Sequence, residues 1–361
     1  MFKLSNHFMS HDVYKSFIDE SHFLSQLGKV FDWDEMAAPL WNLAKNARGG
    51  RPRQSPIVLL KMLFLSFLYN RSDREMEHMA TSDLYVKYFL QLPIDGLSPD
   101  HSSLSRFREE VLEKEGSEFF TKMFESILNE AVRHGIVFGR VYAIDATHVV
   151  SSVSGKIDSH EVQTYGTTSK DKDASWGCKG FETKISREGT HVQVGKYFFG
   201  YKVHGLCETK RGIVTNLSVT TGSTTDLDAA DTLLHQILTN KQRAAIDVLT
   251  ADKGYGCPVF VNLIEKYSSI MTAFHLPDTM TKRGEHKLKW QTYVKDEGRT
   301  AFRKERAVIE RVFGDTKNKH GLRRARYKGL PKLYLQSTLT MMVHNVKIIL
   351  KQISGVGLQR T

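Results

Sequence analysis

Residues 299–329 of the chain read RTAFRKERAVIERVFGDTKNKHGLRRARYKG, a stretch rich in helix formers and in positive charge. It has no proline, and its composition predicts a helix over 300–319 that ends before Gly321. At about 100° per residue, Ile309 and Phe313 fall on one apolar face of this helix. That face should pack on a hydrophobic core.

Beside the apolar face, a stripe about 60° wide carries one carboxylate among cations. Its members are Arg303, Arg306, Glu310 and Lys317. Such a stripe is commonly an exposed ladder of ion pairs, and this interpretation stays open. The stripe borders the buried face, however, and the positive charge continues through Arg323 and Arg324. A carboxylate in a surface that attracts phosphate suits a metal-assisted reaction at a phosphodiester.

The overall composition is that of a folded, basic protein. Of its 361 residues, 40% are hydrophobic, which supports a substantial core and excludes a disordered chain. The formal net charge is +11 and the pI is near 9.4, so we expect a polyanionic partner. Nucleic acid fits better than a membrane surface, because nothing resembles a basic amphipathic anchor.

Cysteine usage and the apolar runs predict a cytoplasmic, soluble protein that does not associate with membranes. Cys178, Cys207 and Cys257 form no CxxC pair, so we expect a reducing compartment and no structural zinc. The N-terminus shows no signal-peptide pattern. The longest apolar run, 57–69, is too short to span a membrane and is interrupted by Lys61.

A second acidic candidate lies in the apolar segment 140–150, which reads RVYAIDATHVV. The segment is apolar on both alternating faces, as in a central strand covered on both sides. Asp145 would lie in its middle, where an isolated carboxylate is costly unless it is paired, hydrogen-bonded or metal-bound. Thr147 would share its face. The alternative is a turn-forming Asp at a strand end, which the apolar continuation after Asp145 disfavours.

A third candidate is Asp252, which ends the apolar run 245–251. Gly254 follows, and Pro258 should begin the next helix. In α/β proteins, ligands gather at the carboxyl ends of strands, where such side chains meet. Asp252 could equally be a turn or capping residue. Lys253 beside it is a candidate phosphate contact.

The segments between these candidates predict further strands and helices. Residues 151–195 are polar and are interpreted as a long irregular excursion, and 276–299 as a basic loop. The apolar-rich segments 197–207 and 213–219 predict a hairpin, 226–238 a helix, and 333–353 a packing helix. On the first hairpin strand, Lys202 is a candidate DNA contact, and His204 is more simply a hydrogen-bonded residue than a metal ligand.

The N-terminal third predicts short helices. Arg48-Gly-Gly-Arg-Pro-Arg53 is a basic joint in which Arg51 and Arg53 could contact a DNA backbone or simply be solvated. Helices are expected over 56–69, after the capping box 72–75, over 82–90 and over 102–112. With surface arginines at Arg106 and Arg108, this suits a helix-turn-helix-like DNA-binding unit. A helical bundle that only braces the rest is the alternative.

Taken together, these residues resemble the DDE transposases of bacterial insertion sequences. The family signature Tyr-x2-Arg-x3-Glu-x6-Lys is met by Arg306, Glu310 and Lys317, whereas Arg303 stands in the tyrosine position. Residues 143–147 resemble the first acidic motif and 251–255 the second. The segments 50–80 and 99–109 resemble the helical N-terminal domain of one large branch. The resemblance covers roughly residues 45–330.

The resemblance implies an α/β fold with a ribonuclease-H-like core, which is a mixed five-stranded sheet flanked by helices. Asp145, Asp252 and Glu310 would gather two Mg²⁺ or Mn²⁺ ions, with Asp145 bridging both, a chemistry that suits hard cations. Water would cut the transposon end, and the freed 3′-hydroxyl would attack target DNA. Arg306 and Lys317 would hold phosphates. The partners would be double-stranded DNA, as inverted repeats and target, and further copies in a dimer or larger assembly.

The expected organisation is an all-helical N-terminal DNA-binding domain over 1–135, a catalytic domain over 136–330 with the polar insertion 151–195, and a C-terminal packing helix within 331–361. Two other functions remain open: a catalytically inactive, domesticated DNA-binding protein, and a metal-dependent nuclease without strand transfer. The presence of all three acids argues against the inactive protein, because a binding module does not need them.

Overall fold

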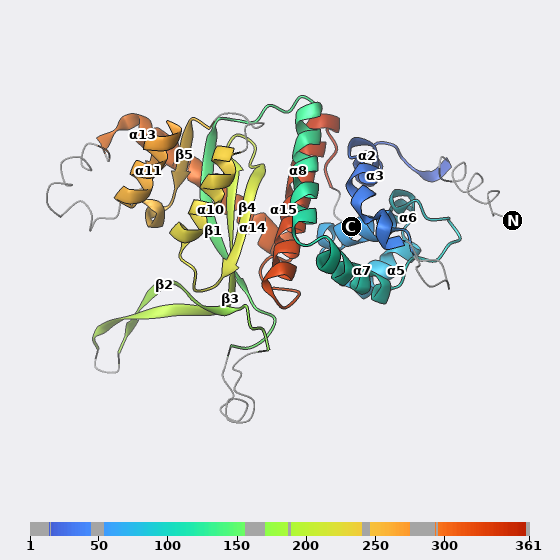
Figure 1. Ribbon diagram of the computed structural model, residues 1–361, viewed down its shortest axis with the longest axis horizontal. Helices are drawn as coiled ribbons and strands as arrows, with labels where there is room; N and C mark the ends of the chain where they lie inside the picture. The colour runs from blue at the N-terminus through green and yellow to red at the C-terminus, as the bar shows by residue number, and fades with distance from the viewer. Residues whose placement is uncertain are drawn as a thin grey trace, which may run out of the picture. The chain divides into compact units, whose positions relative to one another are not determined.

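The computed structural model describes residues 14, 16–44, 54–155, 170–186, 189–239, 246–274, 293 and 295–358. The chain divides into two compact units, Met1–Ile136 with Thr338–Thr361, and Val137–Ser337 (Figure 1). Within the described ranges, no helix combines the length and apolar character needed to cross a membrane. Arg51, Arg53 and most of the expected loop 276–299 lie outside the described residues.

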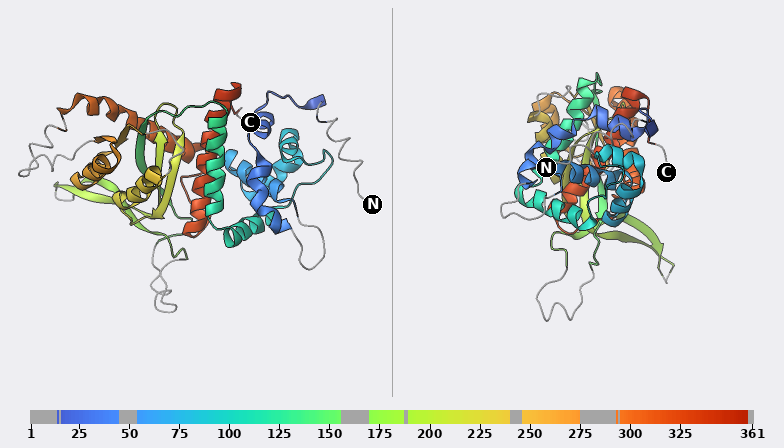
Figure 2. Two further views of the ribbon diagram at one scale, coloured as in Figure 1. Left: turned by 45° about the horizontal axis from the view of Figure 1, so that its top comes forward. Right: turned by 90° about the vertical axis from the view of Figure 1, so that its right-hand side faces the viewer.

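The described part of the first unit is built from helices. They are α2 (Phe23–Val30), α3 (Trp33–Ala37), η1 (Ala38–Ala44), α4 (Pro56–Leu68), α5 (Asp73–Ser82), α6 (Leu84–Leu90), α7 (His101–Lys114), α8 (Glu118–Arg133) and the C-terminal part of α15 (Leu330–Ser354). Helix α4 is buried on nearly every side, because its sequence has no polar face. Helices α8 and α15 lie side by side (Figures 1 and 2). The expected helices over 56–69, 102–112 and 333–353 are therefore present.

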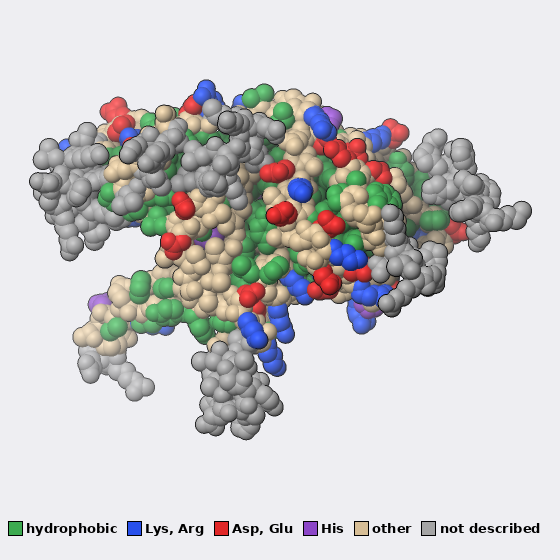
Figure 3. Space-filling model, in the orientation of Figure 1, with side chains coloured by type: hydrophobic (Ala, Val, Ile, Leu, Met, Phe, Trp, Pro, Cys, Tyr) green, Lys and Arg blue, Asp and Glu red, His purple; other side chains and the backbone are tan. Residues whose placement is uncertain are grey.

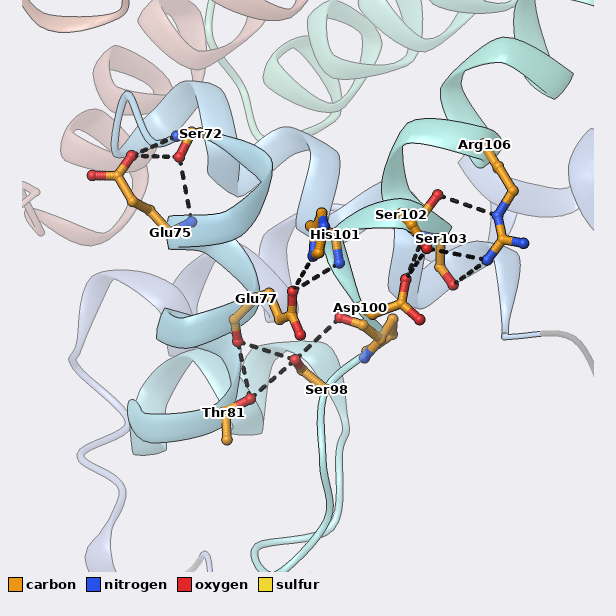
Figure 4. A network of polar contacts seen from close by, with 11 residues as sticks. Ser72, Glu75, Glu77, Thr81, Ser98, Asp100, His101, Ser102, Ser103 and Arg106 are labelled. Carbon is orange, nitrogen blue, oxygen red and sulfur yellow. Dashed lines mark hydrogen bonds and ion pairs between the residues drawn. The ribbon is translucent and has the colours of Figure 1, made fainter.

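Polar contacts fix the start of α5 and join it to α7 (Figure 4). The expected capping box forms, with Ser72 and Glu75 satisfying each other's backbone N–H groups. Further along α5, the Glu77 carboxylate accepts a hydrogen bond of 2.9 Å from the backbone N–H of His101 and lies 2.7 Å from its Nδ1. These contacts set the entry of α7, whose second turn carries the exposed Arg106.

Arg108 differs from the expectation of a surface arginine. Its side chain is buried and donates two hydrogen bonds, of 3.2 and 3.0 Å, to the two carboxylate oxygens of Asp73. The planar guanidinium matches the carboxylate, and the pair joins α7 to the first turn of α5. Arg108 is therefore structural, and Arg106 is the arginine of this helix that remains exposed.

The second unit contains a six-stranded mixed sheet. Its strands are β1 (Val141–Val150), β2 (Ser175–Ile185), β3 (His191–Glu208), β4 (Val214–Thr221), β5 (Val248–Ala251) and β6 (Met271–Phe274). The order is β2-β3-β1-β5-β6, with β4 also paired to β3. Strands β1, β5 and β6 are parallel, and the β3 pairings are antiparallel. The expected hairpin over 197–219 and the central strand over 140–150 are confirmed.

The interpretation of 151–195 as an irregular excursion is wrong for its second half. Strand β2 and the start of β3 form an antiparallel ribbon, so the described sheet has six strands instead of the five that were expected. Apolar side chains alternate with polar ones in this ribbon, which is a strand pattern in a polar segment. A bulge between Cys178 and Phe181, where Gly180 has a φ of +125°, obscures the alternation.

Helices cover both faces of the sheet. They are α10 (Asp226–Thr239), η2 (Lys253–Tyr255), α11 (Pro258–Ser268), α13 (Glu297–Arg303), η3 (Lys304–Arg306) and α14 (Ala307–Lys319). On one face, Ile144 and Leu206 join a core with residues of α10 and α11. On the other face, Gly205 lies under α14, where an added Cβ would be 3.3 Å from the Phe313 ring. The missing side chain lets α14 approach β1 and β3 closely.

The late helix is interrupted, in contrast to the single helix expected over 300–319. Asp296 caps α13 by accepting from the N–H of Arg299, and the tighter η3 then separates α13 from α14. Element η3 contacts β1 and β5, so tertiary packing overrides the helix-forming sequence here. The predicted end is correct, because α14 stops at Lys319 and Gly321 follows in the left-handed region with φ of +75°.

Candidate active site

Asp145 lies in the middle of β1, on the face of the sheet that α14 covers. It pairs across the ladder with Gly205, so both residues point toward that helix. Its Oδ1 accepts a hydrogen bond of 2.8 Å from the N–H of Ala146. Burial raises the pKa of the carboxyl to about 7, and the negative charges of Asp252 and Glu310 add to this rise while Arg306 opposes it. Asp145 is thus a shielded carboxylate with two acidic neighbours.

Asp252 follows directly after β5, the parallel neighbour of β1. Ala143 pairs with Thr250, and continuing this register by two residues brings Asp252 level with Asp145. Its Oδ1 accepts a hydrogen bond of 2.7 Å from the N–H of Gly254, and Asp252 thereby caps the N-terminus of η2. Asp252 therefore caps a turn and also lies at the carboxyl end of a strand, beside the strand that carries Asp145; its role in a site stays a prediction.

Glu310 lies in the first turn of α14, and its side chain is half exposed. Its carboxylate forms an ion pair of 2.6 Å with Arg306, four residues earlier. The packing of η3 on β1 and β5 brings this part of the chain to the strands that carry the other two acids. The effect of both Glu310 and Arg306 on the pKa of Asp145 places them in one electrostatic neighbourhood.

The three acids offer the right donors for a hard divalent cation, although they are not arranged as a finished metal site. In the described part of the chain, no three His, Cys, Asp or Glu side chains are grouped closely enough to hold an ion. The carboxylate of Glu310 is turned to Arg306, and one oxygen of Asp252 is used by Gly254. Burial, with a smaller contribution from the charges of Asp252 and Glu310, raises the pKa of Asp145, and a divalent cation bound here would favour its charged form.

Cations gather near these acids, and one of them is not evident from the sequence. The pKa of Lys317 falls to about 8, because of burial and then of the nearby charges of Lys179 and Arg323. The pKa of His148 falls to about 4, mainly because of burial and further because of the positive charges of Lys317, Lys179 and Arg323. Lys179 comes from β2, in the segment interpreted as irregular. Only strand register brings it here, so no local motif could have predicted it.

The segment after α14 is held against the end of β1. The N–H of Ala325 donates to the carbonyl of Val150 at 2.8 Å, and the two chains form a parallel bridge there. Arg323 Nη2 donates to Asn318 Oδ1 at 2.6 Å, and Arg324 Nη2 donates to the carbonyl of Ser152 at 3.4 Å. Both arginines are exposed next to the strand that carries Asp145.

Other candidates from the sequence are used differently. Lys202 Nζ donates to Asp226 at 2.9 Å and to the carbonyl of Thr224 at 2.8 Å, so its charge is paired within the fold. His204 is buried and lies 2.9 Å from Thr220 Oγ1. Lys253 is exposed directly after Asp252.

Two buried polar groups near these elements lack a hydrogen-bond partner in the described part of the chain. Arg303, which stands in the signature's tyrosine position, has a buried Nε and Nη2 without partners. The break at η3 removes it from the continuous helical stripe that we expected. The Tyr255 hydroxyl is likewise unpartnered, and its pKa is raised by burial and by the charges of Asp226, Asp145 and Asp252. The sequence signal for Tyr255 is its place in the second acidic motif.

Comparison with known proteins shows the class to which this chain belongs. The family described as "Transposase DDE domain" matches residues 138–346, and "Transposase domain (DUF772)" matches residues 12–110. Because the first match covers more than half of the chain, this protein belongs to the DDE transposase family. It is a DNA transposase of the insertion-sequence type, as the sequence resemblance predicted.

Among solved structures, the chain is similar to the piggyBac transposase, determined by cryo-EM in a synaptic complex with hairpin DNA. The sequences are 12% identical, the TM-score is 0.44, and the match covers 99% of this chain and 78% of the other. This degree of similarity is too low to transfer details from one protein to the other.

Proposed function

We propose that this transposase cuts DNA at the ends of its element and joins the freed 3′-hydroxyl to target DNA, on a ribonuclease-H-like core. The observation that carries the proposal is the partly buried Asp145 in the central strand, whose pKa is raised to about 7 by desolvation and, to a smaller extent, by Asp252 and Glu310. Without a bound cation, the repulsion between acids from two adjacent strands and a late helix only destabilises the folded protein. Their proximity is therefore best explained by a cation that they share.

Asp145, Asp252 and Glu310 would hold Mg²⁺ or Mn²⁺, and members of the family generally use divalent metal ions. Two such ions would activate the attacking oxygen and stabilise the leaving oxygen of a phosphodiester displacement. For Glu310 to join the other two acids, its side chain must leave Arg306. Arg306 would then be free to bind a DNA phosphate beside the reacting one.

The surrounding cations would position the DNA backbone. Lys179, Lys317 and Arg323 lie close enough together to lower the pKa of His148, so they present one concentrated positive charge beside the acids. Such a cluster attracts phosphate without reading sequence. Part of the first unit would recognise the ends of the element, with the exposed Arg106 in the second turn of α7 as a candidate contact.

The test is a cleavage and joining assay with the purified full chain. The substrate is a labelled duplex that carries the inverted repeats flanking the gene, with a supercoiled plasmid as target, in Mg²⁺ or in EDTA. We expect metal-dependent nicks at the repeat end and joined products. Nicks without joining would indicate a nuclease, and a gel shift without cleavage would indicate a DNA-binding protein; either result contradicts the proposal.

Asp145→Asn should abolish cleavage and leave DNA binding intact. The loss should exceed the roughly 10- to 100-fold that removing a second-shell partner costs at a metal site. Asp247→Asn is the matched control, because Asp247 precedes β5, lies at its other end and pairs with Arg140. Equal activity of the two variants would show that Asp145 does not act in the reaction.

A further inference from the structure

The ribbon formed by β2 and the first half of β3 exposes an unusual amount of apolar surface. Six of the eleven exposed large hydrophobic side chains in the described part of the chain lie between Trp176 and Tyr197. In Figure 3, hydrophobic side chains, in green, are visible on the arm that this ribbon forms. Large exposed apolar patches on a folded protein usually mark an interaction surface.

The two faces of the ribbon differ in chemistry. Residues that pair directly across an antiparallel ladder share a face. One face carries Phe181, Ile185 and Tyr197, which are 69%, 71% and 64% exposed. The other face carries Glu182, whose carboxylate pairs with Lys184 at 2.8 Å and Lys196 at 2.9 Å. The most exposed of the ribbon's large apolar side chains therefore share one face with Thr183, Gln193 and His191, and the ion pairs lie on the other face together with the exposed Val192 and Val194.

Strand β2 also forms an edge. Among the described strands it pairs only with β3, so the other side of its backbone is free to pair with another strand. A two-stranded ribbon is only marginally stable alone, whereas a sheet of three or more strands with an apolar face can be stable. An added strand would therefore stabilise this ribbon.

The sequence of β2 is complementary to itself in one antiparallel register. When two copies of β2 pair antiparallel, residues directly opposite each other lie on the same face of the joined sheet. Equivalent faces of the two copies therefore meet only if the two-fold axis passes through a residue, which then pairs with itself in the other copy. Centring on Glu182 or on Lys184 would set like charges opposite each other. Centring on Thr183 sets Glu182 opposite Lys184 of a second copy and Phe181 opposite Ile185. The two residue pairs nearest the centre are then matched, one in charge and one in apolar character.

We propose that two copies of this chain associate through the outer edges of β2, antiparallel and centred on Thr183, to form a continuous four-stranded ribbon. The interface is isologous, because each copy offers the same strand. The complementarity of Glu182 and Lys184 selects a second copy over other occupants of the edge. This inference goes beyond the proposed cleavage reaction and stands or falls independently of it.

The test is a charge swap in the full chain, with self-association measured by sedimentation over a wide range of concentration. Glu182→Lys and Lys184→Glu each set like charges opposite each other twice, so each should weaken the dimer by about tenfold or more. An equimolar mixture of these two variants restores both opposite-charge pairs. The mixture should therefore dimerise about as well as the unaltered chain.

Ile185→Ser should also weaken the dimer, whereas Leu97→Ser should not, because Leu97 is exposed in the other compact unit. Circular dichroism checks that each variant folds. A monomer at every concentration, or single swaps that leave the dimer unchanged, would overturn the proposal. So would variants of Ile185 that lose DNA affinity without any change in association, because they would make the ribbon a DNA-binding arm.

Discussion

Lys61 in α4 and Asp145 in β1 are both ionisable side chains set in apolar elements, and burial shifts the pKa of each toward neutrality. The pKa of Lys61 falls to about 8 and that of Asp145 rises to about 7. Lys61 is 4% exposed, donates a hydrogen bond of 3.0 Å to the carbonyl of Phe89, and lies 5.0 Å from the centre of the Phe89 ring. The ionised group that affects its pKa, Asp34, is of opposite charge.

Asp145 has no comparable compensation. It accepts a hydrogen bond from the neighbouring backbone N–H of Ala146, and its charged neighbours are Asp252 and Glu310, of like sign, and Arg306 and Lys317, of opposite sign. A buried charge with a fixed partner is a structural element, whereas a buried charge among like charges stores unfavourable energy until a ligand of opposite charge arrives. Lys61 is buried and Asp145 only partly buried, and the like charges beside Asp145 further distinguish the two sites.

The largest effect on stability should come from Asp145→Asn. Between about pH 4 and 7 the folded protein binds a proton at Asp145 that the unfolded chain releases, so the free energy of unfolding falls as pH rises through this window. The difference could reach about 4 kcal/mol at pH 8, as an upper limit. The variant should lack this loss, and urea unfolding of both proteins from pH 4 to pH 8 would measure it.

Magnesium provides the control for that measurement. Added Mg²⁺ should raise the stability of the unaltered chain at pH 8, because a ligand that binds only the folded state stabilises it, and should act much less on Asp145→Asn. Asp247→Asn should follow the unaltered chain in both respects. If all three proteins showed the same pH profile, Asp145 would be no more strained than an exposed carboxylate.

Sequence reasoning found Asp145 because a carboxylate in a run that is apolar on both faces has few structural explanations. It noticed Lys61 only as an interruption of an apolar run, since the carbonyl that satisfies it lies 28 residues away in the chain. Lys179 and the β2–β3 ribbon were missed for the same reason, because pairing between distant segments decides their positions. The break at Lys304–Arg306 was not predictable either, since good helix formers occupy it and contact with the sheet tightens the turn.

Lys61→Met should show the opposite pH dependence from Asp145→Asn. Above about pH 8 the folded protein releases the Lys61 proton that the unfolded chain keeps up to about pH 10.5, so the stability of the unaltered chain rises across this window. The rise could reach about 3 kcal/mol, and methionine, with similar volume and no charge, should remove it. Urea unfolding from pH 7 to pH 10 tests this prediction, with Lys29→Met as the exposed control. Parallel curves for all three proteins would contradict it.

Arg306→Gln should have the smallest effect on stability and still affect the reaction. The Arg306–Glu310 pair is partly exposed, and such pairs four residues apart contribute about 0.3–0.5 kcal/mol. Arg306 also offsets part of the like-charge repulsion at Asp145, so its loss should raise the pKa of Asp145 further and make Mg²⁺ more stabilising.

DNA cleavage by Arg306→Gln should fall because a phosphate contact is lost. Lys319→Gln, which removes a similar ion pair with Asp315, should leave cleavage unchanged. Unfolding curves with and without Mg²⁺, together with the cleavage assay, separate these effects. If Arg306→Gln destabilised the protein by several kcal/mol, the pair would be structural, like Lys61, and the contrast between the two regions would not extend to the edge of the site.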